Sequence, residues 1–194
     1  MRLFIAIGVE DLNFSPQMIL KKLRVNLNRK GLEYRWLPEE NYHITLNFLG
    51  EIPLEKVEMI KAMLAEVSHR HVFFHLKLHG LGAFPGIKEG RVIWMDVQNS
   101  MALRALQEDC EARLIELGFS LEIRPYVPHL TLARLRNPRN LKDVLSPLIN
   151  QHFGEMAVKS LILYESRLGG AFPIYEPLLK FPLRERIRSA ESIE

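Results

Sequence analysis

The clearest indication of the fold is the stretch Asn41-Tyr42-His43-Ile44-Thr45-Leu46-Asn47-Phe48-Leu49-Gly50. A second stretch near the other end of the chain repeats its pattern. That second stretch is Arg124-Pro125-Tyr126-Val127-Pro128-His129-Leu130-Thr131-Leu132-Ala133-Arg134. Alternate side chains of a β-strand point to one face, so each histidine shares a face with its threonine, and the apolar residues point to the other face. Two such strands facing each other would bring two imidazoles and two hydroxyls into one cleft.

The two threonines of these motifs, Thr45 and Thr131, are the only threonines in the chain, and each follows a histidine by two residues. With 7 histidines in 194 residues, composition alone gives this coincidence odds of about one in a thousand, which makes the pair a motif. An isolated His-x-Thr would instead indicate an ordinary strand histidine. The offset of 86 residues from His43 to His129 predicts two similar lobes of one α+β domain.

Length and composition are those of a soluble globular protein. A chain of 194 residues with 47% hydrophobic and 25% charged residues suits one domain. The net charge of +3 is compatible with an anionic substrate but excludes a protein that coats long nucleic-acid duplexes. The predicted organisation is a single bilobal catalytic domain over residues 1–183, followed by a charged tail over 184–194.

Cysteine content and hydropathy indicate the compartment. No apolar run approaches the length of a membrane span, and the residues at the start of the chain lack the layout of a signal peptide. The one cysteine, Cys110, rules out an intrachain disulfide and fits a reducing environment. Cys110 also falls on the apolar stripe of a predicted helix, so we expect it in the core. We predict a cytoplasmic monomer with no membrane partner.

Hydrophobic periodicity predicts alternating strands and helices along the chain. The expected strands are at residues 3–9, 41–50, 74–79, 91–97, 124–134, 156–166 and 174–183, with the prolines of the last favouring a sheet edge. The expected helices are at 15–31, where Ser15 and Pro16 begin the helix, at 54–67, at 103–118 and at 141–150, which Pro147 interrupts. Residues 80–90 are expected to form a loop, and residues 134–139 a basic turn.

A pair of histidines in one cleft suits proton transfer in two directions. Imidazole titrates near neutrality, so one ring can act as a base while the other, protonated, acts as an acid. Two hydroxyls beside them can donate hydrogen bonds to an anion, and an arginine can clamp a phosphate. This set of groups is suited to opening a strained phosphodiester, and it predicts a reaction that needs no metal and no cofactor.

The motifs His43-Ile44-Thr45-Leu46 and His129-Leu130-Thr131-Leu132 resemble the paired signatures of the two-histidine (2H) phosphoesterase superfamily. The chain is most similar to the RNA 2′,3′-cyclic phosphodiesterases, also called 2′-5′ RNA ligases, and the similarity covers almost its whole length. Further matching stretches are Met1-Arg2-Leu3-Phe4-Ile5-Ala6-Ile7, Gly82-Ala83-Phe84-Pro85 and Leu163-Tyr164-Glu165-Ser166. The resemblance implies a bilobal α+β fold, in which two pseudo-symmetric lobes of mainly antiparallel sheet with flanking helices surround a central cleft. It also implies hydrolysis of a terminal 2′,3′-cyclic phosphate to a 2′-phosphate, and an ability to join RNA ends.

The resemblance also implies roles for individual residues. His129 would be the proton acceptor that activates water, and His43 the proton donor to the departing 3′ oxygen, although the two motifs are so alike that the residues alone allow either order. Substrate-binding roles would fall to Thr45 and Thr131, which hold phosphate oxygens, to Arg134, which contacts the phosphate, and to Phe48, which stacks on the terminal base. Phe48 shares a face with Leu46 in a regular strand, which favours the core, so the stacking role requires a bend after Leu46.

Three alternatives remain open. A metal could bind the cluster His69, His71, His75 and His79, of which the last three are spaced by four and would lie on one face of a continuous strand. Residues four apart in a strand are about 13 Å apart, however, which is too far to ligate one ion. A non-catalytic RNA-binding module could use the cleft together with Arg124, Arg134, Arg136 and Arg139, although it would not need two His-Thr pairs. The same chemistry could also act on a small cyclic nucleotide or an ADP-ribose cyclic phosphate instead of an RNA end.

Overall fold

The structure is a computed structural model that describes residues 1–9, 12–14, 17–98, 100–120, 125–170 and 172–185. Its strands are β1 (Arg2–Gly8), β2 (Leu12–Phe14), β3 (Tyr34–Trp36), β4 (His43–Glu51), β5 (Phe74–Phe84), β6 (Gly90–Val97), β7 (His129–Arg139), β8 (His152–Val158), β9 (Ser160–Arg167) and β10 (Ile174–Pro182). Its helices are α1 (Gln17–Arg29), α2 (Leu54–Arg70), α3 (Met101–Glu116) and α4 (Lys142–Leu145), with short 3₁₀ turns η1 (Glu39–Asn41), η2 (Ile87–Glu89) and η3 (Ser146–Leu148). The 3₁₀ turn η3 places Pro147 near its start, which confirms the predicted interruption there.

The strands form one sheet in the order β10-β9-β1-β4-β7-β6-β5-β8-β2, with β3 added beside β7. Neighbouring strands along this path are antiparallel. The two motif strands, β4 and β7, therefore lie next to each other in the middle of the sheet. The α+β fold class with a large antiparallel sheet is confirmed, and β10 lies at the edge as predicted.

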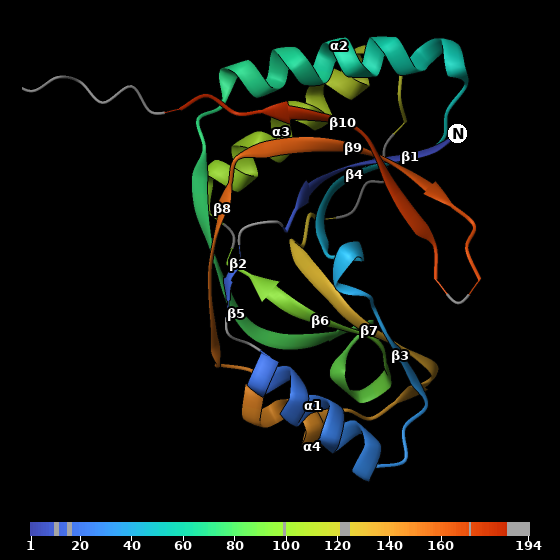
Figure 1. The fold of residues 1–194 in the computed structure, drawn as a ribbon, viewed down its shortest axis with the longest axis vertical. Coiled ribbons are helices and arrows are strands. Elements are labelled where there is room, and N and C mark those ends of the chain that lie inside the picture. The colour runs from blue at the N-terminus through green and yellow to red at the C-terminus, as the bar shows by residue number, and fades with distance from the viewer. Residues whose placement is uncertain (10–11, 15–16, 99, 121–124, 171, 186–194) are drawn as a thin grey trace, which may run out of the picture.

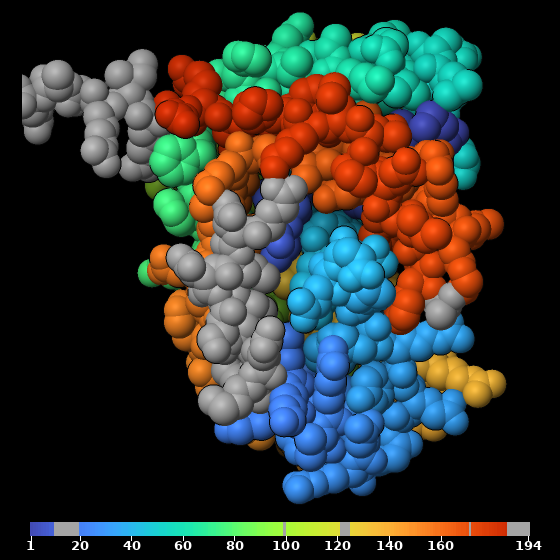
Figure 2. All heavy atoms as spheres, in the orientation of Figure 1, coloured from blue at the N-terminus to red at the C-terminus, as the bar shows by residue number. Residues whose placement is uncertain are grey.

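The helices divide between the two halves of the sheet (Figure 1). Helices α2 and α3 lie together at the end of the molecule that holds β9 and β10, whereas α1 and α4 lie together at the opposite end. Figure 2 shows the same face with all atoms, where the segment around η1 occupies the middle between these two ends. Each half therefore has its own pair of helices, and the motif strands meet where the halves join.

The interior is one continuous hydrophobic core that extends through both halves. Ile44 and Leu130, the apolar residues inside the two motifs, are fully buried at its centre. Cys110 is buried on α3 as predicted, and burial raises the pKa of its thiol to about 12, which keeps it protonated and unreactive. The start of α3 is capped by Ser100, whose Oγ accepts a hydrogen bond from the Leu103 amide at 3.1 Å.

Two of the expected irregular segments are strands. The predicted loop at 80–90 is wrong over its first half, because β5 continues to Phe84. Glycine is needed there, since Gly82 pairs with Trp94 and a side chain at Gly82 would collide with the indole ring. The predicted turn at 134–139 is also wrong, because strand β7 extends to Arg139, which pairs with Gly90 of β6 after an irregularity in the register.

The predicted strand at 156–166 is in fact two strands that separate at Lys159. Strand β8 pairs with β5 in one half of the sheet, while β9 pairs with β1 in the other half. A continuous apolar pattern cannot reveal this crossing, since both strands are buried in the same way. Three predicted features lie outside the described residues: the start of the first helix at Ser15 and Pro16, the residue Arg124, and positions 186–194 of the tail. The domain boundaries remain a prediction.

Candidate active site

Strand β4 presents His43 and Thr45 on one face and buries Ile44 and Leu46 on the other. Strand β7 does the same with His129 and Thr131, which are half-buried, while Leu130 and Leu132 are fully buried. The predicted alternation is therefore confirmed in both motifs. The apolar residues of each motif must face the core, and this fixes the direction in which the His-Thr pair points. A shift of the strand register by one residue would exchange the two faces.

The two motif strands pair where Ile44 lies opposite Leu130 in antiparallel orientation. The residues that flank an antiparallel pair also face each other across the strands. His43 therefore lies across from Thr131, and Thr45 across from His129, all on the face opposite the buried pair. The four motif side chains thus form a compact group in which each imidazole has the other motif's hydroxyl as its cross-strand neighbour.

Both motif strands contain a bulge at the same position. The register of β4 with β1 skips Leu46, and the register of β7 with β6 skips Leu132. Each bulge places two buried residues in succession and moves the following residue to the opposite face. That residue is Phe48 in β4 and Arg134 in β7, each five positions after its histidine.

The bulge settles the placement of Phe48. Phe48 is 68% exposed, so the expectation of a core residue in a regular strand is wrong, and the bend after Leu46 that the stacking role required is present. Arg134 is exposed on strand β7 and not in a turn. The two lobes therefore offer different groups at equivalent positions, an aromatic ring beside the first motif and a cation beside the second.

Each catalytic candidate is held by the same backbone contact. His43 Nδ1 lies 2.7 Å from the carbonyl oxygen of Asn41, and His129 Nδ1 lies 2.8 Å from the carbonyl oxygen of Val127. A carbonyl can only accept, so in both rings Nδ1 carries the hydrogen and donates it. When the rings are neutral, Nε2 is therefore left as the free acceptor in both, which is the form that a general base requires.

Aromatic rings surround both imidazoles. The ring centroids of Phe4 and Tyr175 each lie 5.0 Å from that of His43. Phe84 lies 4.9 Å from His129, edge to face, and Trp94 lies 6.2 Å away. These rings restrict the rotation of the imidazoles and exclude water. Sequence reasoning missed them as site residues, since aromatic residues on strands read as ordinary core.

Burial changes the protonation of both rings. The pKa of His43 is lowered from its ordinary value of 6.5 to about 4. Desolvation is the largest cause, a hydrogen bond from the ring to the Asn41 carbonyl opposes it, and the charges of His129 and Arg134 add to the lowering. Desolvation and the charge of Arg134 also lower the pKa of His129. Both imidazoles are therefore neutral at pH 7 in the free protein, and Arg134 acts electrostatically on both of them.

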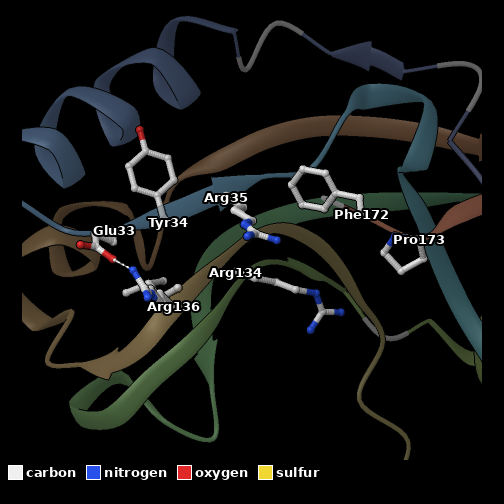
Figure 3. Close-up of a pocket in the computed structure, with 8 residues that line it drawn as sticks. Glu33, Tyr34, Arg35, Arg134, Arg136, Phe172 and Pro173 are labelled. Atoms are coloured by element: carbon white, nitrogen blue, oxygen red, sulfur yellow. Dashed lines mark hydrogen bonds and ion pairs between the residues drawn. The ribbon is translucent and has the colours of Figure 1, made fainter. Parts of the chain in front are cut away.

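Four of the six candidate residues line two cavities, whereas His43 and Thr131 are among the lining residues of neither. One, of about 810 Å³, brings together Thr45, Phe48 and His129. It is lined further by groups that the sequence did not suggest: Leu46, Asn47, Phe84, Pro85, Arg91, Val92, Gln107, Glu111, Pro125, Tyr126 and Val127. Tyr126 supports the site, because its hydroxyl donates a 3.2 Å hydrogen bond to the carbonyl of Thr45. The other cavity, of about 590 Å³, is lined by Arg134 and is shown in Figure 3.

The alternative metal site is not supported by the structure. His69 belongs to α2, and His71 follows the end of that helix and not a strand, so the assumed continuous strand is wrong. His71 instead pairs with Asp109 of α3 at 2.9 Å. Within the described ranges no three side chains of His, Cys, Asp or Glu gather closely enough to hold a metal ion.

Comparison with known proteins identifies the family. The profile of the "LigT like Phosphoesterase" family matches the chain twice, at residues 14–94 and 96–175, so that each match contains one of the two motifs. RNA 2′,3′-cyclic phosphodiesterase of Archaeoglobus fulgidus is 35% identical over 184 residues, which are 93% of this chain and 99% of the relative. The enzyme of the same name from Methanocaldococcus jannaschii is 35% identical over 179 residues, covering 91% and 97%.

Solved structures agree with this assignment. A Thermus thermophilus protein superposes with a TM-score of 0.74 at 28% identity, covering 96% of this chain and all of that chain. Escherichia coli LigT in complex with 3′-AMP superposes with a TM-score of 0.69 at 26% identity, covering 94% and 97%. Because the family profile matches the chain twice and each match contains one motif, the chain belongs to the LigT-like 2H phosphoesterases, the family of the RNA 2′,3′-cyclic phosphodiesterases.

Proposed function

We propose that this protein hydrolyses the terminal 2′,3′-cyclic phosphate of RNA to a 2′-phosphate, with His129 as the base and His43 as the acid. The observation that carries the proposal is the pairing of Ile44 with Leu130, which puts both imidazoles on one face with matching Nδ1 hydrogen bonds. The relatives named RNA 2′,3′-cyclic phosphodiesterase support the substrate class. The solved complex of E. coli LigT with 3′-AMP supports a site for a nucleoside with a ribose phosphate.

In the proposed reaction, His129 Nε2 takes a proton from a water molecule as the water oxygen attacks phosphorus. The bond between phosphorus and the 3′ oxygen breaks, and His43 gives its Nε2 proton to that oxygen, which leaves as the 3′ hydroxyl. The phosphate stays on the 2′ oxygen. The cycle closes when the proton gained by His129 returns to solvent and His43 is protonated again.

The acid in this scheme must carry a proton, although the pKa of His43 is only about 4 in the free protein. A bound phosphate anion favours the imidazolium form and raises the pKa of a neighbouring ring. The substrate therefore creates the protonation state in which it is cleaved, and His43 takes up its proton as the phosphate binds.

The remaining site residues act on the phosphate and the base. The hydroxyls of Thr45 and Thr131 donate hydrogen bonds to the non-bridging phosphate oxygens, and the guanidinium of Arg134 balances their charge. Phe48 provides an exposed aromatic face on which the terminal base stacks. Side chains alone thus supply the acid, the base and the charge stabilisation, so we expect no metal or cofactor requirement.

The test is to incubate the protein with an RNA oligonucleotide that ends in a 2′,3′-cyclic phosphate, with and without EDTA. We expect a 2′-phosphate product at equal rates under both conditions. A 3′-phosphate product would contradict the assignment of the leaving group. Turnover that EDTA abolishes and one particular metal restores would contradict the metal-independent mechanism.

Removing either threonine hydroxyl should have a moderate effect. Thr45→Val and Thr131→Val each remove one hydrogen bond to a charged group, which is worth roughly 1.5–3 kcal/mol, and should lower kcat/KM roughly 10- to 100-fold. The serine variants keep the hydroxyl and serve as matched controls that should retain most of the activity. Equal losses in the serine and valine variants would show that packing of the methyl group matters and the hydroxyl does not.

We further propose that the protein acts as a cytoplasmic monomer and that it can also join RNA ends by the reverse of related chemistry. Among the residues that the structure describes, no helix is long and apolar enough to cross a membrane. Size-exclusion chromatography with light scattering measures the oligomeric state directly.

A further inference from the structure

The cavity shown in Figure 3 adjoins the reaction centre but takes no part in the chemistry described above. It has a volume of about 590 Å³ and lies between strands β3 and β7 on one side and Phe172 and Pro173, which precede β10, on the other. Arg134, whose charge acts on both histidines, forms its border with the active site. A ligand in this cavity would therefore touch the same guanidinium as the reacting phosphate.

The floor of this cavity carries a concentration of positive charge. Arg35 of β3 pairs directly with Arg134 of β7, and Arg136 follows two residues later on the same face. Glu33 pairs with Arg136 at 3.1 Å, so the residues that line the cavity include three guanidinium groups and one carboxylate. This excess of positive charge suits a phosphodiester.

The opposite wall of the cavity is apolar. Figure 3 shows the ring of Phe172 above the guanidinium groups of Arg35 and Arg134, with Pro173 beside it. Tyr34 also lines the cavity, while its hydroxyl donates a hydrogen bond to Asn28 Oδ1 at 3.0 Å. An aromatic face above cations is the combination that binds single-stranded nucleic acid, where bases stack and the backbone is neutralised.

One buried residue connects this wall to the catalytic centre. Asn41 donates a 3.2 Å hydrogen bond from Nδ2 to the carbonyl of Pro173, and its own carbonyl accepts from His43 Nδ1 at 2.7 Å. Asn41 is only 9% exposed, and both bonds are partly buried. The position of the apolar wall is therefore tied to the imidazole that protonates the leaving group, which gives the cavity a defined place relative to the reacting phosphate.

From these observations we infer that the cavity is a subsite for the nucleotide on the 5′ side of the cyclic end. This inference rests on the proposed function. The phosphodiester of that nucleotide lies between Arg35 and Arg134, and its base stacks on Phe172. The preferred substrate is therefore an RNA end of at least two nucleotides and not a cyclic mononucleotide.

The test compares two substrates: adenosine 2′,3′-cyclic phosphate and the dinucleotide ApA with a 2′,3′-cyclic end. The parent protein should have a kcat/KM about 5- to 150-fold higher for the dinucleotide, the range that one stacked base provides. Arg35→Met and Phe172→Ala should each bring the ratio of the two values close to one. Arg139→Met, an exposed arginine at the far end of β7, is the matched control and should leave the ratio at the parental value.

The outcomes separate the inference from the proposed function. A parental ratio near one, or a ratio that neither Arg35→Met nor Phe172→Ala changes, overturns the subsite while the hydrolysis itself stands. Failure of the parent to hydrolyse either substrate overturns the proposed function and the subsite together. Because Phe172 lies outside the sheet, Phe172→Ala tests the subsite even if Arg35→Met disturbs the pairing of β3 with β7.

Discussion

Replacing His43 or His129 with alanine is expected to lower kcat for the cyclic phosphate about 10²- to 10⁴-fold, the range of a positioned acid or base. In the proposed mechanism each imidazole transfers one of the two protons, and water cannot reproduce a ring oriented by its Nδ1 hydrogen bond and edge contacts with aromatic rings. The double variant should be scarcely slower than the slower single variant, because groups that act as a unit do not have additive effects. Steady-state rates for the parent and the three variants measure this.

The matched control is His75→Ala, since His75 is exposed on β5 outside the site. Its turnover should equal that of the parent. A substrate with sulfur in place of the 3′ oxygen separates the two roles, because a thiolate leaves without a proton. This substrate should restore turnover of His43→Ala and not of His129→Ala. Restoration of His129→Ala alone would reverse the assignment, and near-parental turnover of either variant on the normal substrate would contradict the two-histidine mechanism.

The second large effect concerns pH. We expect kcat/KM to reach its maximum below about pH 6.5. The reaction needs one neutral and one protonated imidazole, and the free protein populates this state most at a pH between the pKa values of the two rings. Both of these values are lowered, that of His43 to about 4. Phosphate binding raises both, so the maximum of kcat, which reports the bound complex, should lie at higher pH. Neither the acidic nor the basic side of the pH–rate profile reports a single residue, since the two rings titrate as a pair.

Rates measured from about pH 4 to 9 give both profiles, over the range in which imidazoles titrate. Arg134→Met provides a further arm, since removal of a charge that lowers both pKa values should move the kcat/KM maximum to higher pH. Coincident maxima for kcat and kcat/KM would contradict protonation by the bound phosphate. A flat kcat/KM profile would contradict acid–base catalysis by the imidazoles altogether.

Much of the site could be predicted from local pattern alone. The His-x-Thr-Leu repeat indicated two strands with a shared orientation, and both strands have the predicted faces. This prediction succeeded because alternation is a property of the extended backbone, and the burial of Ile44 and Leu130 leaves only one choice of face. The buried place of Cys110 on a helix followed from helical spacing in the same way.

Predictions failed where a residue's surroundings come from distant parts of the chain. A regular strand would have buried Phe48, but a bulge at Leu46 turns it outward, as its predicted stacking role required. Residues 80–84 read as a loop because of their glycines, yet they continue β5 since Gly82 must leave room for Trp94. In the same way His71 reads as part of a strand, whereas it ends a helix and pairs with Asp109, which is 38 residues away.

The types and spacing of His43, Thr45, His129 and Thr131 are covalent facts, so the sequence alone identified the groups that we propose for the chemistry. The tertiary structure alone decided their protonation and surroundings. Desolvation lowers the pKa of His43 only after the core and the aromatic rings have closed around it. The second cavity forms only where β3, β7 and the residues just before β10 meet. The local hydrophobic pattern of a sequence does not indicate which residues more than a hundred positions apart will touch, so that cavity could be found only in the folded chain.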